Sequence, residues 1–167
     1  MSESIILWFE ENLPVAPIWI IFIVSMIPIV ELRGALLAAG PLFGIDMWQA
    51  AIVSILGNMV PIPFILWFIT PIFNWMKKTK RFRPMVEKLE KKSMGKSDQI
   101  QKYEFTGLML FVGVPLPGTG AWTGALIASL LGIDLKKALL SIFLGVCLAA
   151  VIMCVISYGI PWLITLF

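Results

Sequence analysis

Histidine is absent from the chain of 167 residues, and only 14% of its residues are charged. Without an imidazole, the sequence lacks the usual general base of hydrolases and the commonest zinc ligand. Its hydrophobic content of 59% lies well above the roughly 45–50% of soluble domains. These shortages disfavour a water-soluble domain and an enzyme. We therefore expect no catalytic residue, no metal ion and no cofactor.

Charge is missing altogether from four long stretches. Residues 12–30, 47–76, 105–133 and 138–167 contain no Asp, Glu, Lys or Arg. Each stretch is close to or longer than the roughly 20 apolar residues of a transmembrane helix. The two cysteines, Cys147 and Cys154, lie seven residues apart, and a helix would separate them by about 10 Å, beyond disulfide reach. The sequence predicts an all-α, multi-pass integral membrane protein.

Positive charge is concentrated in one loop, because ten of the 13 lysine and arginine residues lie between Lys77 and Lys102. Such a loop is expected on the cytoplasmic side, so we predict that residues 77–103 are cytoplasmic. They form either an amphipathic helix on the leaflet or a solvated linker. The N-terminus carries acidic residues and no basic ones, and we expect both termini outside.

The two halves of the chain resemble one another. Gly34-Ala35-Leu36 recurs as Gly124-Ala125-Leu126, Gly44-Ile45-Asp46 as Gly132-Ile133-Asp134, and Ala50 and Gly57 match Ala138 and Gly145. Several matches in one order indicate a duplicated unit. With an odd number of crossings in each unit, the copies would lie in opposite senses. We therefore predict an inverted repeat with a site near the membrane midplane.

Each repeat is interrupted by a segment rich in proline and glycine. The short apolar segments that follow, 34–43 and 124–131, would span only about 15 and 12 Å as helices, too little for a hydrocarbon core of about 30 Å. A re-entrant hairpin that returns to its own side accounts for such lengths. Irregular backbone at that depth requires a protein or water lining.

We therefore predict one transmembrane domain, residues 1–167, made of two repeats. Repeat 1–76 has a hairpin at about 14–44 and a membrane helix at about 46–70, and repeat 104–167 has a hairpin at about 105–132 and a membrane helix at about 135–158. Asp46 and Asp134 are expected to cap these membrane helices. Pro61 and Pro63 would either kink the first or split residues 47–76 into two helices.

The first interruption contains Glu31 and Arg33, the only charged residues between Glu11 and Asp46. Ionisable groups at membrane depth usually mark a substrate or proton route. Glu31 would then be a protonatable carboxylate, and Arg33 would bind an anionic group or hold Glu31. Pro28 and Gly34 of the same interruption are further candidate residues of this substrate- or proton-binding site. Pairing of the two charges requires local unwinding, because residues two apart diverge on a helix. The alternative is that both side chains snorkel to the interface.

The second interruption is uncharged but rich in hydrogen-bonding groups. Its candidate binding residues are Pro115, Pro117, Gly118, Thr119, Gly120, Trp122, Thr123 and Gly124. A turn of this kind at the start of a half-helix presents donors and a positive dipole end to an anion. Alternatively, its glycines serve only tight turning and close helix packing.

These two interruptions carry a family resemblance. Residues 28–34 (Pro-Ile-Val-Glu-Leu-Arg-Gly) and 115–125 (Pro-Leu-Pro-Gly-Thr-Gly-Ala-Trp-Thr-Gly-Ala) resemble the small multidrug export protein family of bacteria and archaea. That family is similar to the DedA/VTT superfamily, whose members have two facing re-entrant hairpins and are implicated in moving lipids, including polyprenyl-phosphate carriers, in a proton-linked manner. Pro28 and Glu31 match the DedA Pro-x-x-Glu. Where DedA proteins carry two arginines around the second proline, this chain has Val114 and Gly120.

The resulting hypothesis is a proton-coupled transporter in the plasma membrane of a prokaryote. Its partners would be membrane lipids, protons and either a phosphate-headed lipid or a small amphipathic compound, without nucleic acid, and a homodimer could enclose the path. A cationic substrate would pair with Glu31 and stack on Trp122, whereas a phosphate would pair with Arg33. The alternative function is a passive lipid scramblase or a membrane-assembly factor.

Overall fold

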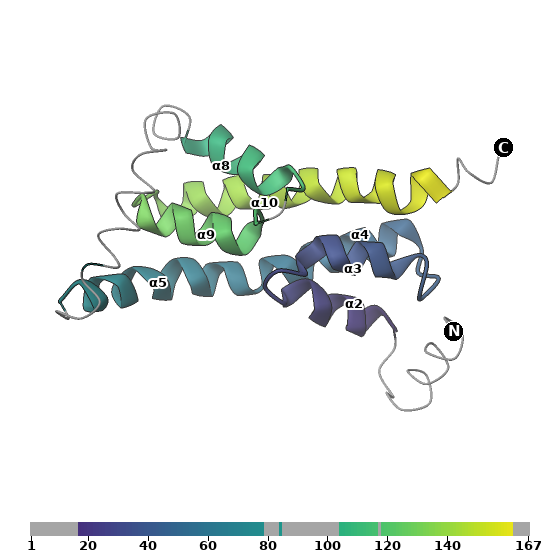
Figure 1. The fold of residues 1–167 in the computed structure, drawn as a ribbon, viewed down its shortest axis with the longest axis horizontal. Coiled ribbons are helices and arrows are strands. Elements are labelled where there is room, and N and C mark those ends of the chain that lie inside the picture. The colour runs from purple at the N-terminus through teal and green to yellow at the C-terminus, as the bar shows by residue number, and fades with distance from the viewer. Residues whose placement is uncertain (1–16, 79–83, 85–103, 117, 162–167) are drawn as a thin grey trace. The chain divides into compact units, whose positions relative to one another are not determined.

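The computed structural model describes residues 17–78, 84, 104–116 and 118–161 (Figure 1). Within these ranges every regular element is a helix, which confirms the all-α prediction. The elements are α2 (Pro17–Met26), α3 (Glu31–Ala39), α4 (Met47–Met59), α5 (Pro61–Lys78), α8 (Glu104–Gly113), α9 (Ala121–Leu130), α10 (Leu135–Cys154) and the π-helix η1 (Val155–Gly159). Most of the predicted cytoplasmic loop, Pro117 and both chain ends lie outside the described residues.

Two stretches are long and apolar enough to cross a bilayer, Met47–Ile69 and Leu135–Gly159. They match the predicted membrane helices at about 46–70 and 135–158. Only 28% and 39% of their most apolar windows are buried, whereas the core helix of a soluble protein is mostly buried. The exposed surface includes Trp48 and Trp67, each 69% exposed. These features indicate a membrane protein.

The first of these stretches is interrupted at Val60, which separates α4 from α5. Of the two arrangements left open by the sequence, the structure therefore has two helices. Val60 precedes a proline, and that position disfavours helical geometry. Pro61 is the first residue of α5, where its missing N–H and fixed φ are tolerated. The second stretch, without internal proline, runs unbroken through α10 into η1.

The chain forms two compact units. The first consists of residues 1–59 and 147–167, so its described helices are α2, α3, α4, the end of α10 and η1. Helices α2, α3 and α4 pack pairwise against one another (Figure 1). Their shared core includes Ile21, Leu32 and Leu36, which are fully buried. Gly57 of α4 lies directly against the Phe22 carbonyl and the Ser25 side chain of α2, leaving no room for a Cβ.

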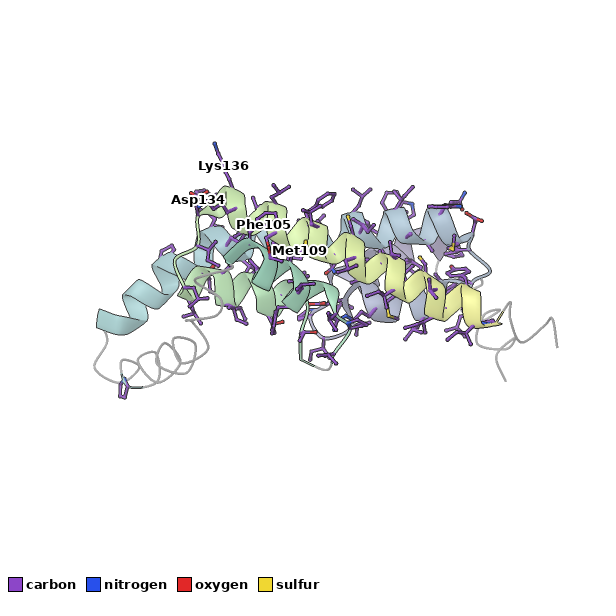
Figure 2. The ribbon with its side chains drawn as sticks, turned by 90° about the horizontal axis from the view of Figure 1, so that it is seen from above. Phe105, Met109, Asp134 and Lys136 are labelled. Atoms are coloured by element: carbon purple, nitrogen blue, oxygen red, sulfur yellow. The ribbon has the colours of Figure 1, made fainter. Side chains whose placement is uncertain are left out.

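The second unit consists of residues 60–146 and contains α5, α8, α9 and the first part of α10. Helix α9 packs against both α5 and α8. Figure 2 shows Phe105 and Met109 on α8, and Asp134 and Lys136 at the start of α10. The Ser141 hydroxyl of α10 donates to the Phe105 carbonyl. Nearby, a Cβ at Gly145 would lie 2.7 Å from the Met109 carbonyl oxygen, so α8 and α10 are in close contact.

Matched residues of the two sequence halves have matching structural roles. Ala35, Ala125, Ala50 and Ala138 are all fully buried, and Gly44 and Gly132 have φ angles of 60° and 67°. The Asp46 carboxylate accepts a hydrogen bond from the Trp48 amide, and the Asp134 carboxylate accepts from the Lys136 and Lys137 amides. Both predicted helix caps are therefore confirmed. The first unit contains the C-terminal part of α10, which belongs to the second repeat, and the second unit contains α5, which belongs to the first repeat.

The glycine contacts show the same correspondence in finer detail. Gly57 touches residues 22 and 25 in the first unit, and Gly145 would touch Met109 and Val112 in the second. The two contacted residues are three apart in both units. Ser25 lies two residues before the first interruption begins at Ile27, and Val112 lies two residues before the second begins at Val114. This correspondence supports duplication of the unit, while the inversion of one copy stays a prediction.

Candidate functional site

The first interruption is short and its backbone departs from helical geometry. Helix α2 ends at Met26 and α3 begins at Glu31, so only residues 27–30, here called the first break, are irregular. This is shorter than expected, because Leu32 to Gly34 are already helical. Ile29 and Glu31 have positive φ angles of 82° and 49°. For such bulky or long side chains this is a strained conformation, which is typical of functional positions.

The two charged residues predicted as a site lie at the start of α3. Glu31 is only 5% exposed, Arg33 is half-buried, and the two side chains attract each other electrostatically. Pro28 is exposed in the break, and Gly34 lies against the Val30 side chain. The functional roles of all four residues stay predictions.

The packing of α2 on α4 shows where the first break lies along the apolar stretch Met47–Ile69. Gly57, which touches Phe22 and Ser25, has ten residues before it and twelve after it within the span Met47–Ile69. The break begins two residues after Ser25, and the Glu31 amide donates to the Ile27 carbonyl. The first break therefore follows directly after the part of α2 that packs on the middle of this apolar stretch.

Three buried polar side chains of α2 and α4, which the sequence did not predict as a site, lie in this part of the first unit. Ser25, Ser54 and Asn58 are 0%, 0% and 2% exposed. The Ser25 hydroxyl donates to the Phe22 carbonyl. The Ser54 Oγ and the Asn58 Oδ1 have no hydrogen-bond partner among the described residues. In the sequence, the only sign of this pair was that Ser54 and Asn58 are polar residues four apart in an apolar stretch without charge.

The second interruption, residues 114–120, is here called the second break. Helix α9 begins at Ala121, so Trp122, Thr123 and Gly124 are helical rather than part of the turn. Gly118 and Gly120 have φ angles of 79° and 147°, a region open to glycine at little cost. Gly124 is buried, and a Cβ there would lie 2.5 Å from the Val112 side chain. Pro115 is half-buried in the turn.

Both threonine hydroxyls of this region contact the backbone of the turn itself. Thr119 Oγ1 lies 2.9 Å from the Val114 carbonyl and 2.8 Å from the Leu116 carbonyl, and Thr123 Oγ1 lies 3.2 Å from the Gly120 carbonyl. Their observed contribution is to hold the turn in shape. The start of α9 still places the positive end of its dipole at Gly120 and Ala121.

The second break also follows a helix that packs on the middle part of a long apolar stretch. Gly145, against which Val112 packs, is two residues, or about 3 Å, from the centre of Leu135–Gly159. The break begins two residues after Val112. Each break therefore follows a helix that packs on the middle part of one of the two long apolar stretches.

An apolar groove of about 440 Å³ lies in the first unit. It runs between α4 and the last part of α10 with η1, and its lining includes Trp48, Ile52, Ile55, Val151 and Val155. Cys147 and Cys154, which are free thiols as their spacing predicts, also line it. A groove with this lining suits a hydrocarbon chain or an apolar ring.

Comparison with known proteins identifies the family. Residues 31–152 match the family described as "Putative small multi-drug export protein". The chain belongs to this family. The matched region begins at Glu31 and contains Arg33, the second break and both long apolar spans up to residue 152. No curated protein and no solved structure matches the chain. A member of an export family with two membrane-capable helices is a membrane protein concerned with transport.

Proposed function

We propose that the protein is a proton-coupled exporter of a lipid or a small amphipathic compound. The observation that carries this proposal is the burial of the Glu31 side chain, with a positive φ, directly after the first break. In the proposed arrangement this carboxylate lies near the middle of the bilayer. A carboxylate at that depth is costly unless it binds a partner, and proton relays of transporters use such groups. Family membership supports export.

In this mechanism the two breaks are re-entrant tips that meet at the membrane midplane. In support of this arrangement, each break follows a helix that packs on the middle part of a long apolar stretch, and the two units share equivalent glycine contacts. The inverted repeat, and the relationship to DedA proteins, belong to the same proposal. Alternating exposure of the breaks would move substrate from the cytoplasmic side outward, with residues 77–103 inside and both termini outside.

The substrate would be held by complementary parts of the first and second breaks. Arg33 and the donors at Gly118 to Gly124 would bind an anionic headgroup, whereas Glu31 and Trp122 would bind a cation. The apolar groove along α4 would take a chain or ring of the substrate. Protons and membrane lipids are then the partners, a homodimer is compatible with the short chain, and no covalent step is needed.

The test uses the purified full chain in liposomes, with a dye-efflux assay and a lipid-flipping assay run with and without a pH gradient. We expect activity in one assay that depends on the gradient. In Glu31→Gln the gradient-driven part should fall to the level of protein-free liposomes, because the side chain no longer releases a proton. Asp46→Asn is the matched control, since asparagine also caps helices and Asp46 is exposed.

Two results would contradict the proposal. Full gradient-driven activity in Glu31→Gln would remove Glu31 from coupling. Lipid flipping that is equally fast without a gradient, in both the wild type and this variant, would instead identify a passive scramblase.

A further inference from the structure

The C-terminal end of α4 gathers oxygen atoms that lack hydrogen-bond donors. Ser54 and Asn58 are four residues apart and therefore share one face of α4. Both are buried, and Ser54 Oγ and Asn58 Oδ1 have no partner among the described residues. Two hydrogen-bond acceptors thus lie one turn apart in an apolar environment. Buried polar groups of this kind are normally satisfied, so their lack of a partner points to a ligand.

Two prolines leave backbone oxygens at the same end of α4 without their usual donors. Within a helix, the carbonyls of Gly57 and Met59 would accept from the amides of residues 61 and 63. Pro61 and Pro63 have no N–H, so these carbonyls have no helical donor. The interruption at Val60 also ends α4 there, and the end of a helix carries a partial negative charge.

These oxygens lie at the depth where water is scarcest. Asn58 is the central residue of Met47–Ile69, with eleven residues on either side. In hydrocarbon an unsatisfied carbonyl or hydroxyl is costly, and interrupted membrane helices are tolerated where the freed groups find a partner. In transporters, the C-terminal ends of broken helices and unwound carbonyls coordinate coupling cations.

The chemistry of the oxygens selects the class of ligand. An amide oxygen, a hydroxyl and backbone carbonyls are hard, neutral ligands. Soft or borderline transition metals prefer thiolate or imidazole, and Ca²⁺ and Mg²⁺ are usually bound with carboxylates. Among the described residues, no cluster of three or more His, Cys, Asp or Glu could hold a metal ion. A neutral oxygen set with a negative helix end therefore suits a monovalent cation.

We infer that the C-terminal end of α4 binds an alkali-metal cation, with Ser54 and Asn58 as side-chain ligands and the freed carbonyls of Gly57 and Met59 beside them. Its side-chain ligands are residues other than Glu31 and the helix-capping aspartates. The inference adds a cation to the proposed transport but does not depend on it, because binding is measured without a gradient or a substrate.

The experiment compares thermal unfolding of the purified full chain in NaCl, KCl and choline chloride at equal ionic strength. Choline has the same charge but is an organic quaternary ammonium ion, to which oxygen ligands cannot coordinate as they do to a metal ion. At about tenfold excess over the dissociation constant, we expect a midpoint about 3–6 °C higher in the favoured alkali salt than in choline. Retention of radioactive sodium or rubidium by the purified protein gives a second readout that does not rely on unfolding.

Variants assign the effect to the site. The salt-specific shift and the ion retention should be lost in Asn58→Leu and in Ser54→Ala, and kept in Asn58→Asp, which retains an oxygen ligand. Ser141→Ala is the matched control, because Ser141 is equally buried but bonded to the Phe105 carbonyl. Equal midpoints in all three salts with no retained ion would overturn the inference and leave a bound water in the site. A shift that survives Asn58→Leu and Ser54→Ala would overturn it too.

Discussion

Replacing Gly145 by alanine is expected to separate α8 from α10 in the second unit. The new Cβ would lie 2.7 Å from the Met109 carbonyl oxygen and 2.7 Å from the Val112 Cβ. One of these atoms belongs to the backbone and the other is the stiff branch point of a valine, so neither can turn away. The helices themselves must move.

The size of the effect follows from these distances. To reach an ordinary contact of at least 3.4 Å, the two helices must move apart by about 0.7 Å. A gap of about that size forfeits a quarter to a half of the dispersion attraction between facing atoms. Overpacking of this kind costs about 1–3 kcal/mol, while the change from glycine to alanine within a helix returns up to about 1 kcal/mol.

Gly159→Ala separates the cost of overpacking from the gain of replacing glycine by alanine in a helix. Gly159 lies in η1, in the same long apolar span, but its nearest atom to a new Cβ is 3.7 Å away. The difference in unfolding free energy between Gly145→Ala and Gly159→Ala should therefore be about 1–3 kcal/mol, or about 2–12 °C in the midpoint. Thermal unfolding of both purified variants in the same detergent measures it.

The duplicated contact provides an internal check on the reasoning. Gly57→Ala meets the Phe22 carbonyl and the Ser25 side chain in the first unit, so it should destabilise to a similar extent. If Gly145→Ala and Gly57→Ala unfold at the same temperature as Gly159→Ala, the close helix approaches described above are wrong. If only one of them is destabilised, the two units are not equivalent in packing.

Two further predictions concern single hydrogen bonds. Asp134→Ala should lower the unfolding free energy by about 1 kcal/mol, because the Lys136 and Lys137 amides lose their acceptor. Asp134→Asn should keep most of this stabilisation, because asparagine also caps helices. Equal losses in the two variants would exclude capping. Tyr158→Phe should cost about 0.5–1.5 kcal/mol by removing the bond to the Ile45 carbonyl. An unchanged midpoint in thermal unfolding would show that this bond contributes nothing.

The candidate site could be located from the sequence but not completed. Charge and proline placed Glu31 and Arg33 at an interruption, because charged residues are rare in an apolar chain. Ser54 and Asn58 gave only a weak signal, since serine and asparagine are tolerated on either face of a helix. Their burial depends on which face of α4 meets α2 and α3, and this is a property of packing between segments.

The sequence by itself determined the helical class, the two interruptions, the two aspartate caps and the repeated glycines, because these follow from local backbone preferences and from the length of uncharged runs. Only the tertiary structure decided which face of α4 is buried, that Glu31 has a positive φ, that residues 155–159 form a π-helix, and that the first unit contains the end of α10 while the second contains α5. These features depend on contacts between residues far apart in the chain. Local preference leaves several such arrangements open, and side-chain packing selects among them.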